Sequence, residues 1–236
     1  MHRSRIGQRL RGLPRSLAEL NRSLQHLGSL RELGWHRSLI GHASVDLQGR
    51  PLPWYSYPCI DWLGGQLRAT DVVFEFGGGW STLWYAARVR RVVSVEHDEV
   101  WHARLMEAVS PNVELHLRAW AEGDDDRAQG DSSPYVRCIE QYPTGTFDVV
   151  VVDGVERPAC SSAAIAYLKP DGLLILDNSD RPAYRSAVEL LTERGYGRID
   201  FYGFAPGSGL SGCTSVFARS FDRWVSTDSV LRTWGL

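Results

Sequence analysis

The sequence predicts an α/β fold in which a doubly wound, mostly parallel sheet of seven strands ends with an antiparallel strand. Three observations predict it. Short apolar runs alternate with stretches of helical periodicity, which is typical of parallel strands covered by helices on both faces. The first two runs enclose a glycine turn, Gly77–Gly79. The last two runs, 197–204 and 213–219, are joined by a loop too short for a crossover helix, so they should pair antiparallel.

The elements can be placed in order along the chain. Prolines keep the segment after residue 50 extended, and Ile60, Leu63 and Leu67 predict a short helix that leads into the first strand. We place the first five strands by their apolar runs, at 71–76, 92–96, 113–118, 147–152 and 172–177. We place the helices that alternate with or follow them at 80–90, 98–109, 157–168 and 181–194.

The first 50 residues differ in composition from the domain that we expect at 51–236. Residues 1–40 hold eight arginines against two glutamates. Five leucines in this basic extension recur at helical spacing: Leu17, Leu20, Leu24, Leu27 and Leu30. Three roles are open: a helix that packs on the domain or on a second subunit, a transit peptide, or a helix on an anionic membrane surface. We favour packing, with a homo-oligomer formed through this helix as one form of it.

Composition argues against several classes of protein. The formal net charge of −2 and the pI of about 6.4 argue against a nucleic-acid binder that acts through bulk charge. No segment is long and apolar enough to span a membrane. The four cysteines lack Cys-x-x-Cys spacing, which indicates reduced thiols in a cytoplasmic protein.

The glycine turn predicts a nucleotide-type binding site. Glycine accepts positive φ at low cost, and its missing Cβ lets a ligand lie against the backbone where a helix begins. Glu96, at the tip of the next strand, suits hydrogen bonds to two ribose hydroxyls. A phosphate-binding P-loop is excluded because no lysine follows the glycines, and a dinucleotide fingerprint would need glycine where Thr82 stands.

The pattern E-x-G-x-G-x-S, from Glu75 to Ser81, resembles motif I of the class I S-adenosylmethionine (SAM)-dependent methyltransferases. The span 51–219 is also similar to a less characterised bacterial set of these enzymes, although Trp80 stands where a small polar residue is expected. The resemblance implies SAM as cofactor, with the glycine loop against its methionine part and Glu96 on its ribose. From the resemblance and from position at the strand tips, the expected cofactor contacts are Glu75, Gly77, Gly78, Gly79, Ser81, Glu96, His97, Trp120 and Asp153.

Two of these residues carry further expectations. His97 should contact the cofactor edge, because the methyl acceptor should lie nearer the fourth and fifth strands. Trp120, at the end of the third strand, either supports the adenine ring or packs in the core. The polar, acidic stretch 122–133 that follows it is expected to be a solvated loop or a lid beside the site.

A second group of polar residues follows strands four and five. Asp153 ends one strand, and Asp177 and Asn178 end the other, so hard oxygen ligands should converge there. This resembles catechol-type and macrolide-sugar O-methyltransferases, in which such residues hold a divalent metal that acidifies a substrate hydroxyl. The resemblance thus implies Mg²⁺ on Asp153, Asp177 and Asn178, although Glu156 stands where the catechol enzymes have lysine. Alternatively, Asp177 and Asn178 cap the following helix.

The resemblance implies methyl transfer to an oxygen of a small molecule or a saccharide, with Asp153 as the group that removes the proton. Trp54, Tyr55 and Tyr57 could form an aromatic wall for such an acceptor or pack against the core. Two other functions stay open. A nicotinamide-dependent oxidoreductase would need a Tyr/Lys or His proton donor, for which no motif is present. A non-catalytic SAM-binding module would share the pocket but not need Asp153.

Overall fold

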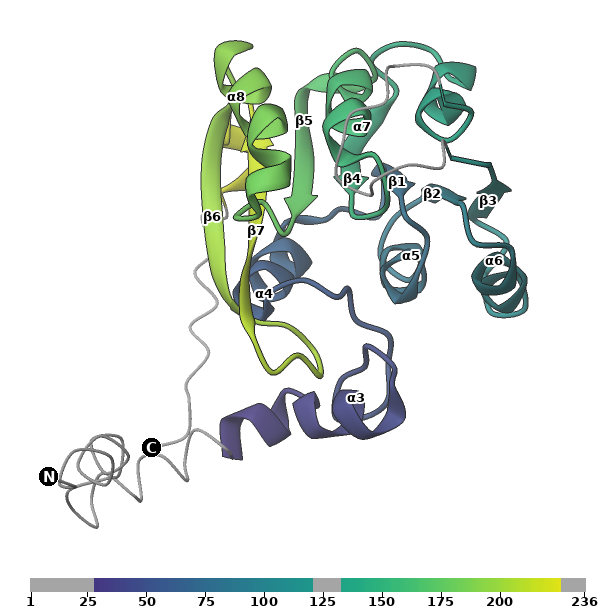
Figure 1. Cartoon of the computed structure of the whole chain (residues 1–236), viewed down its shortest axis with the longest axis vertical. Helices are drawn as coiled ribbons and strands as arrows, with labels where there is room; N and C mark the ends of the chain where they lie inside the picture. The colour runs from purple at the N-terminus through teal and green to yellow at the C-terminus, as the bar shows by residue number, and fades with distance from the viewer. Residues whose placement is uncertain (1–27, 121–132, 226–236) are drawn as a thin grey trace, which may run out of the picture.

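The computed structural model describes residues 28–120 and 133–225. Its centre is a seven-stranded sheet in the order β3-β2-β1-β4-β5-β7-β6 (Figure 1). Strands β1 to β5 pair in parallel, whereas β7 runs antiparallel to both β5 and β6. This confirms the predicted sheet. The strands are Val72–Phe76 (β1), Arg91–Glu96 (β2), Val113–Leu117 (β3), Phe147–Val152 (β4), Leu168–Asp177 (β5), Gly197–Phe204 (β6) and Ser211–Ala218 (β7).

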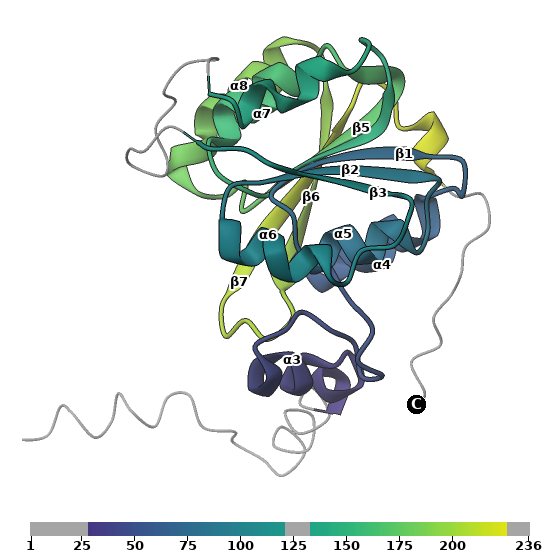
Figure 2. The same cartoon turned by 90° about the vertical axis from the view of Figure 1, so that its right-hand side faces the viewer.

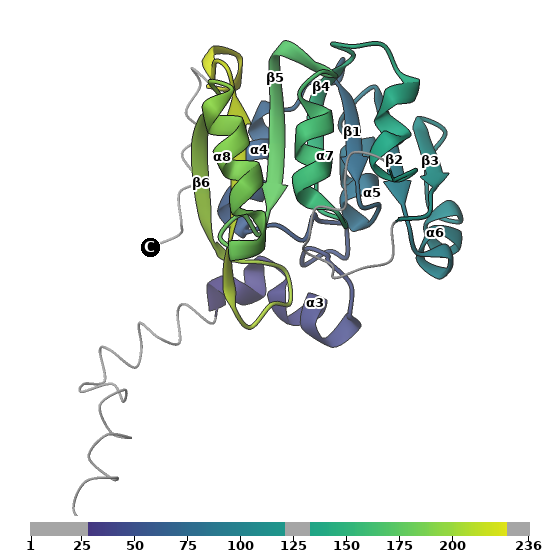
Figure 3. The same ribbon diagram turned by 45° about the horizontal axis from the view of Figure 1, so that its top comes forward.

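Helices cover both faces of the sheet, as Figure 2 shows most directly. One face carries α4 (Tyr57–Gln66), α5 (Trp80–Ala86) and α6 (Glu99–Met106), and the other carries α7 (Arg157–Ala164) and α8 (Arg185–Glu193). A further helix, α3 (Trp35–Gly41), lies beyond one edge of the sheet, beside the loop that joins β6 and β7 (Figure 3). Residues 28–32 are also helical, and three short 3₁₀ helices are present: η2 (Val136–Gln141), η3 (Pro182–Tyr184) and η4 (Asp222–Trp224).

The alternation of side chains along each strand builds two apolar layers. On β1, Val72 and Phe74 pack in the layer that also holds α7 and α8, while Val73 packs in the layer under α4 and α5. Burial of both faces explains why the strands read as almost continuous apolar runs. It also leaves Glu75, on the α5 side of β1, without exposed surface.

The direction of the strands gathers polar residues at one edge. Because β1, β2, β4 and β5 are parallel, their carboxyl ends meet on the same side of the sheet. The chain leaves β1 toward β2 and β3, but after crossing over it continues from β4 toward β5, so the order reverses between β1 and β4. In open α/β sheets, ligands bind in the crevice at such a reversal.

At the opposite edge, the end of the described chain is fixed to the sheet. Arg223 forms ion pairs with Asp71 and, at 2.8 Å, with Asp148. Trp224 is fully buried and donates from Nε1 to the carbonyl of Asp171 at 2.8 Å. No helix within 28–120 or 133–225 is long and apolar enough to cross a membrane.

Several sequence expectations fall outside the described residues. The leucine-spaced helix of the extension lies almost wholly within 1–27, and the polar stretch falls within 121–132 apart from Ser133. The proposed roles of these two segments stay predictions.

Candidate functional site

A cavity of about 1080 Å³ opens at the carboxyl edge, where the strand order reverses. Its floor is formed by the glycine turn and by the tips of β2, β4 and β5. Its outer wall is formed by residues in and after α3 and by the β6–β7 loop. The predicted site residues that line it are Gly77, Gly78, Gly79, Ser81, Glu96, His97, Asp153, Asp177 and Asn178.

The glycine turn is shaped by close approach of two loops. Gly77 has φ of +97°, and a Cβ there would lie 2.7 Å from the backbone of Gly154, which follows β4. Gly78 is fixed from the other side, because Trp101 on α6 donates from Nε1 to its carbonyl at 2.7 Å. Gly79 has an extended φ of −171°, and a Cβ there would make only an ordinary contact, at 3.7 Å from Ser81 Oγ. Backbone therefore faces the cavity where a side chain would otherwise fill it.

Glu75 lies behind this turn and does not line the cavity. Its carboxylate accepts hydrogen bonds from Thr82 and, at 2.9 Å, from Ser94. Thr82 in turn accepts from the amide of Gly79 at 2.9 Å. Burial raises the pKa of Glu75 to about 7. The sequence predicted a cofactor contact here, whereas the geometry makes Glu75 the group that joins the start of α5 to β2.

Glu96 is buried and lies at the cavity with one oxygen committed to the protein. Its Oε1 accepts from the amides of His97 and Asp98, both at 2.8 Å, and lies 2.9 Å from His97 Nδ1. Among the described residues no hydrogen bond engages Oε2. The carboxylate is therefore held in a fixed orientation and keeps one acceptor oxygen for a ligand in the cavity that Glu96 lines.

Trp120 does not line the cavity. Its ring meets the ring of His97 edge-on at a centroid distance of 5.7 Å and packs against the apolar layer on the α7 side. Of the two interpretations, the geometry therefore favours packing, with Trp120 supporting the imidazole that does line the cavity.

The three predicted metal ligands come together, but around the guanidinium of Arg157. Its Nη2 lies 3.1 Å from Oδ1 of Asp153, and its Nη1 lies 2.5 Å from the carbonyl of Asp177. Nη1 also lies 3.4 Å from Oδ1 of Asn178. The third side chain of this cluster is the carboxylate of Asp177. It accepts a hydrogen bond from the hydroxyl of Thr214 at 2.6 Å.

This arrangement does not fit a divalent cation, since a cationic side chain already lies among the expected ligands. Within 28–120 and 133–225, no group of three or more His, Cys, Asp or Glu is placed to hold a metal. The capping interpretation is not supported either, because neither side chain caps the following 3₁₀ helix. The amide of Tyr184 closes the first turn of this helix by donating to the carbonyl of Arg181 at 3.0 Å.

The carboxylates of the cluster have altered proton affinities. The pKa of Asp153 is raised, first by burial and then by the neighbouring Asp177, and Arg157 partly offsets this rise. Burial also raises the pKa of Asp177, again against the effect of Arg157. The Asp153 side chain remains 16% exposed toward the cavity, so it can exchange a proton with a ligand there.

The outer wall brings in residues far from the glycine turn. Trp54 lines the cavity and is 63% exposed, whereas Tyr55 and Tyr57 are buried in the core, so the aromatic wall consists of one of the three predicted residues. Trp35 on α3 donates to the carbonyl of Ser208 at 2.8 Å, which joins α3 to the β6–β7 loop. The described part of the extension thus contributes to the site.

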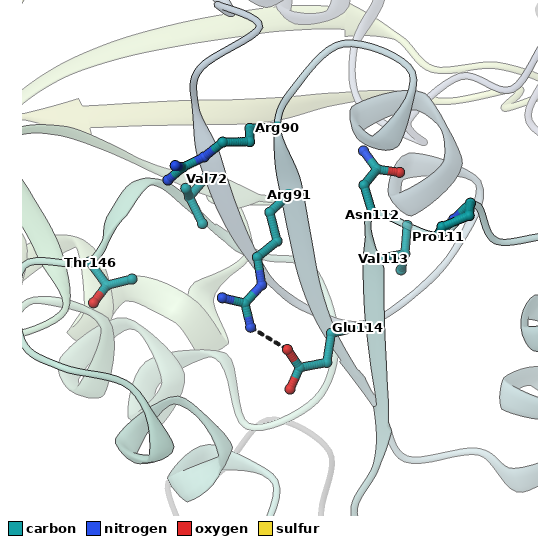
Figure 4. Close-up of a pocket in the computed structure, with 8 residues that line it drawn as sticks. All are labelled: Val72, Arg90, Arg91, Pro111, Asn112, Val113, Glu114 and Thr146. Atoms are coloured by element: carbon teal, nitrogen blue, oxygen red, sulfur yellow. Dashed lines mark hydrogen bonds and ion pairs between the residues drawn. The ribbon is translucent and has the colours of Figure 1, made fainter.

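A second hollow of about 500 Å³ lies at the opposite, amino-terminal edge of the sheet (Figure 4). It is lined by the first residues of three strands, Val72, Arg91 and Val113. Figure 4 shows Arg91 turned toward Glu114, with which it forms an ion pair. Its position away from the carboxyl ends of the strands sets it apart from the usual ligand crevice.

Besides the residues of the outer wall, two residues near the glycine turn were not predicted from the sequence. Trp101 lies three residues after Asp98, the N-cap of α6, and its contact with Gly78 gives it a role in the site. Gly154 follows Asp153 directly, where a Cβ would lie 2.0 Å from the Tyr135 hydroxyl oxygen. In the sequence, a glycine directly after the acid at a strand tip could have indicated that the loops after β1 and β4 approach each other closely.

Comparison with solved structures places this fold among methyltransferases. The O-methyltransferase from Bacillus cereus in complex with S-adenosylhomocysteine (SAH) superposes with a TM-score of 0.53 at 18% identity, over 66% of this chain and 78% of that one. The O-methyltransferase TomG from Streptomyces achromogenes, involved in tomaymycin synthesis and solved with SAM, gives 0.51 at 21% identity, over 80% and 87%. At these identities the likeness shows the fold, which is that of the class I SAM-dependent methyltransferases. No protein-family model and no curated protein sequence matches the chain.

Proposed function

We propose that this protein is a SAM-dependent methyltransferase that acts on an oxygen of a small molecule or a saccharide. The observation that carries the proposal is the pairing of an open glycine turn with the fixed carboxylate of Glu96, across a cavity where the strand order reverses. The fold that it shares with SAM- and SAH-bound methyltransferases supports the same assignment.

In this proposal the cofactor lies along the carboxyl ends of β1 and β2. Glu96 accepts from the ribose hydroxyls through Oε2, since Oε1 is engaged by the protein. The methionine part lies against Gly77–Gly79, where backbone is exposed to the cavity. His97 contacts the cofactor edge, with Trp120 behind it.

The acceptor then lies between the tips of β4 and β5 and the outer wall. Its oxygen attacks the methyl carbon as the sulfonium C–S bond breaks, and the products are the methylated acceptor, SAH and a proton. Asp153 takes that proton, because its carboxylate is exposed to the cavity and has a raised pKa. The remaining contribution is positioning of the two reactants in line.

The outer wall bears on the acceptor class. Trp54, Leu39 and Leu210 line the cavity with large exposed apolar surface. An aromatic face binds planar phenols and the apolar faces of sugar rings alike. Both acceptor classes therefore belong in a substrate screen, and Trp54→Ala should raise the KM for an accepted substrate more than it lowers kcat.

Two alternatives make different predictions. A nicotinamide-dependent oxidoreductase would bind NADH, yet the third fingerprint glycine is replaced by Thr82, which the structure uses to hold Glu75. A non-catalytic SAM-binding module would bind SAH equally well but would retain its full function in Asp153→Asn.

The proposal also covers the basic extension and the cellular compartment of the protein. We propose that the leucine-spaced helix of the basic extension mediates a homo-oligomer of a cytoplasmic enzyme. Sedimentation of the full chain and of a chain lacking 1–27 tests the first point: the same number of chains per particle for both would refute it.

The test of the cofactor is calorimetric titration with SAH, with NADH in parallel. SAH should bind the wild type, and Glu96→Ala should lose about 2–4 kcal/mol of binding free energy, a factor of about 30 or more. Glu96→Gln keeps an acceptor for the amides of His97 and Asp98 but places an NH2 donor where Oε2 would accept from the ribose, so it should also weaken SAH binding. Glu99→Gln removes an exposed carboxylate outside the cavity and should bind like the wild type. A preference for NADH would refute the proposal.

A further inference from the structure

We propose that Arg157 is a built-in cation that occupies the position of a catalytic divalent metal, so that the acceptor site of this protein operates with a guanidinium in its place. The exclusion of a metal follows from the described residues alone. Its consequence for catalysis rests on the proposed function.

Oxygen atoms of the protein surround the guanidinium of Arg157. The three guanidinium nitrogens, which carry five N–H groups, contact five oxygens. Nε donates to the carbonyl of Gly154 at 2.9 Å, and Nη2 lies 3.2 Å from the carbonyl and 3.1 Å from Oδ1 of Asp153. Nη1 reaches the carbonyl of Asp177 and Oδ1 of Asn178 at 2.5 and 3.4 Å. These are carboxylate, carbonyl and amide oxygens, the ligands that Mg²⁺ or Ca²⁺ would take.

The charge of Arg157 is buried beside two carboxylates. Arg157 and Asp177 are both buried, and an arginine is rarely buried without anionic partners. Asp153 forms an ion pair with it at 3.1 Å, the charge of Asp177 also acts on it, and the ring of Tyr184 lies under the guanidinium at 4.9 Å. Removal of the cation would leave two close carboxylates uncompensated, and such loss of one buried partner is strongly destabilising.

Arg157 lies at a helix position that does not favour its charge. It is the first residue of α7, where the helix dipole disfavours a positive charge. The preceding residue, Glu156, adopts a left-handed φ of +51°. This turn lets the guanidinium reach back to the tips of β4 and β5. The anionic oxygens there, rather than the helix, therefore account for the position of the charge.

The consequence concerns the orientation of Asp153. Its Oδ1 is held by Nη2, while the side chain lines the cavity. Arg157 also lines the cavity, but its three guanidinium nitrogens are all engaged by protein oxygens, so we assign its effect on the acceptor to Asp153. Arg157 is therefore a positioning residue, and the acceptor oxygen is met by the carboxylate rather than by a metal ion.

The test uses Mn²⁺ as the probe, followed by the loss of its free electron paramagnetic resonance signal on adding the full-length protein. The wild type should leave the signal unchanged. Arg157→Ala frees the oxygens and should take up one Mn²⁺ per chain, whereas Arg157→Lys keeps a cation in place and should take up none. Adding Asp153→Asn to Arg157→Ala should abolish the gained uptake.

Two results of this assay would overturn the proposal. One is Mn²⁺ uptake by the wild type that disappears in Asp153→Asn. The other is a folded Arg157→Ala variant that takes up no Mn²⁺. SAH titration of the same samples distinguishes the two proposals. A wild type that binds neither SAH nor Mn²⁺ would contradict the proposed function but would agree with Arg157 in place of a metal.

Thermal unfolding covers the case in which Arg157→Ala does not fold. Arg157→Met should lower the melting temperature, and adding Asp177→Asn should recover at least about half of the loss, because the charge balance is restored. A double variant no more stable than Arg157→Met would show that the guanidinium does not compensate these carboxylates, and would overturn the proposal.

Discussion

Glu75 acts on the glycine turn from behind, through hydroxyl groups rather than through a ligand. Its carboxylate holds Thr82 and Ser94, and Thr82 holds the amide of Gly79. A buried acid with a pKa of about 7 releases its proton in the folded protein only near neutral pH. The unfolded chain loses the same proton at a lower pH, near 4.3.

This difference predicts a pH-dependent stability. The folded state binds the proton more tightly, so the contribution of Glu75 to the free energy of unfolding is largest below the unfolded pKa and falls as the pH rises through 7. Relative to the wild type, Glu75→Gln should gain about 3 kcal/mol between pH 4.5 and pH 8. Urea unfolding of both proteins across this range measures it. Glu99→Gln serves as the exposed control, and a difference between Glu75→Gln and wild type that is constant with pH would contradict the prediction.

Trp101 acts on the same turn from α6. Trp101→Phe keeps the aromatic packing and removes the hydrogen bond to the carbonyl of Gly78. We expect SAH affinity to fall by about 1 kcal/mol, close to fivefold, because the loop is less well fixed for its ligand. Trp62→Phe alters a tryptophan that packs on Phe201 away from the cavity and should bind SAH as the wild type does. Calorimetry compares them, and equal affinity for all three would refute this role of Trp101.

At the scale of elements, the loops after β1 and β4 touch through glycines on both sides. The contact holds the glycine turn against the tip that carries Asp153, whose amide donates to the carbonyl of Phe76 at 2.9 Å. The two halves of the cavity floor are therefore coupled by backbone packing and not by side chains.

A pair of glycine variants tests this contact. Gly77→Ala adds a Cβ at 2.7 Å from Gly154 and imposes a φ of +97° on alanine, which should cost at least about 2 kcal/mol of stability. At Gly79 the φ is extended and a Cβ would lie at an ordinary contact distance of 3.7 Å from Ser81 Oγ, so Gly79→Ala should leave the melting temperature nearly unchanged. Differential scanning calorimetry distinguishes the two. Equal melting temperatures would show that the loops separate readily.

At the scale of the whole molecule, the two edges of the sheet have different tasks. The carboxyl edge holds the cavity, and the amino edge is closed by η4 through Arg223 and Trp224. Stability and ligand binding should therefore respond to different substitutions.

Trp224→Ala tests this separation. It removes a fully buried indole and should lower the free energy of unfolding by about 3–5 kcal/mol. Because Trp224 does not line the cavity, the folded fraction should bind SAH with unchanged affinity. Val225→Ala, next to it and 64% exposed, should alter neither quantity. A loss of SAH affinity in folded Trp224→Ala would show that the two edges are coupled.

The sequence by itself determined the sheet and the floor of the cavity. Apolar runs locate the strands because both faces of a parallel sheet are buried, and a loop too short for a helix requires an antiparallel final pair. Glycines and acids directly after such runs must meet at one edge, since the carboxyl ends of parallel strands coincide. Gly77, Glu96 and Asp153 were therefore found from local pattern alone.

Only the tertiary structure decided where the side chains at that edge turn. Glu75 faces α5 and not the cavity, because alternation along β1 places it on that side and its hydroxyl partners come from two other elements. Trp54 reaches the cavity while Tyr55 and Tyr57 enter the core. Arg157 lies among the expected metal ligands because a left-handed turn at Glu156 directs it there. Such directions depend on contacts between segments far apart in the chain, which no local spacing of residues encodes.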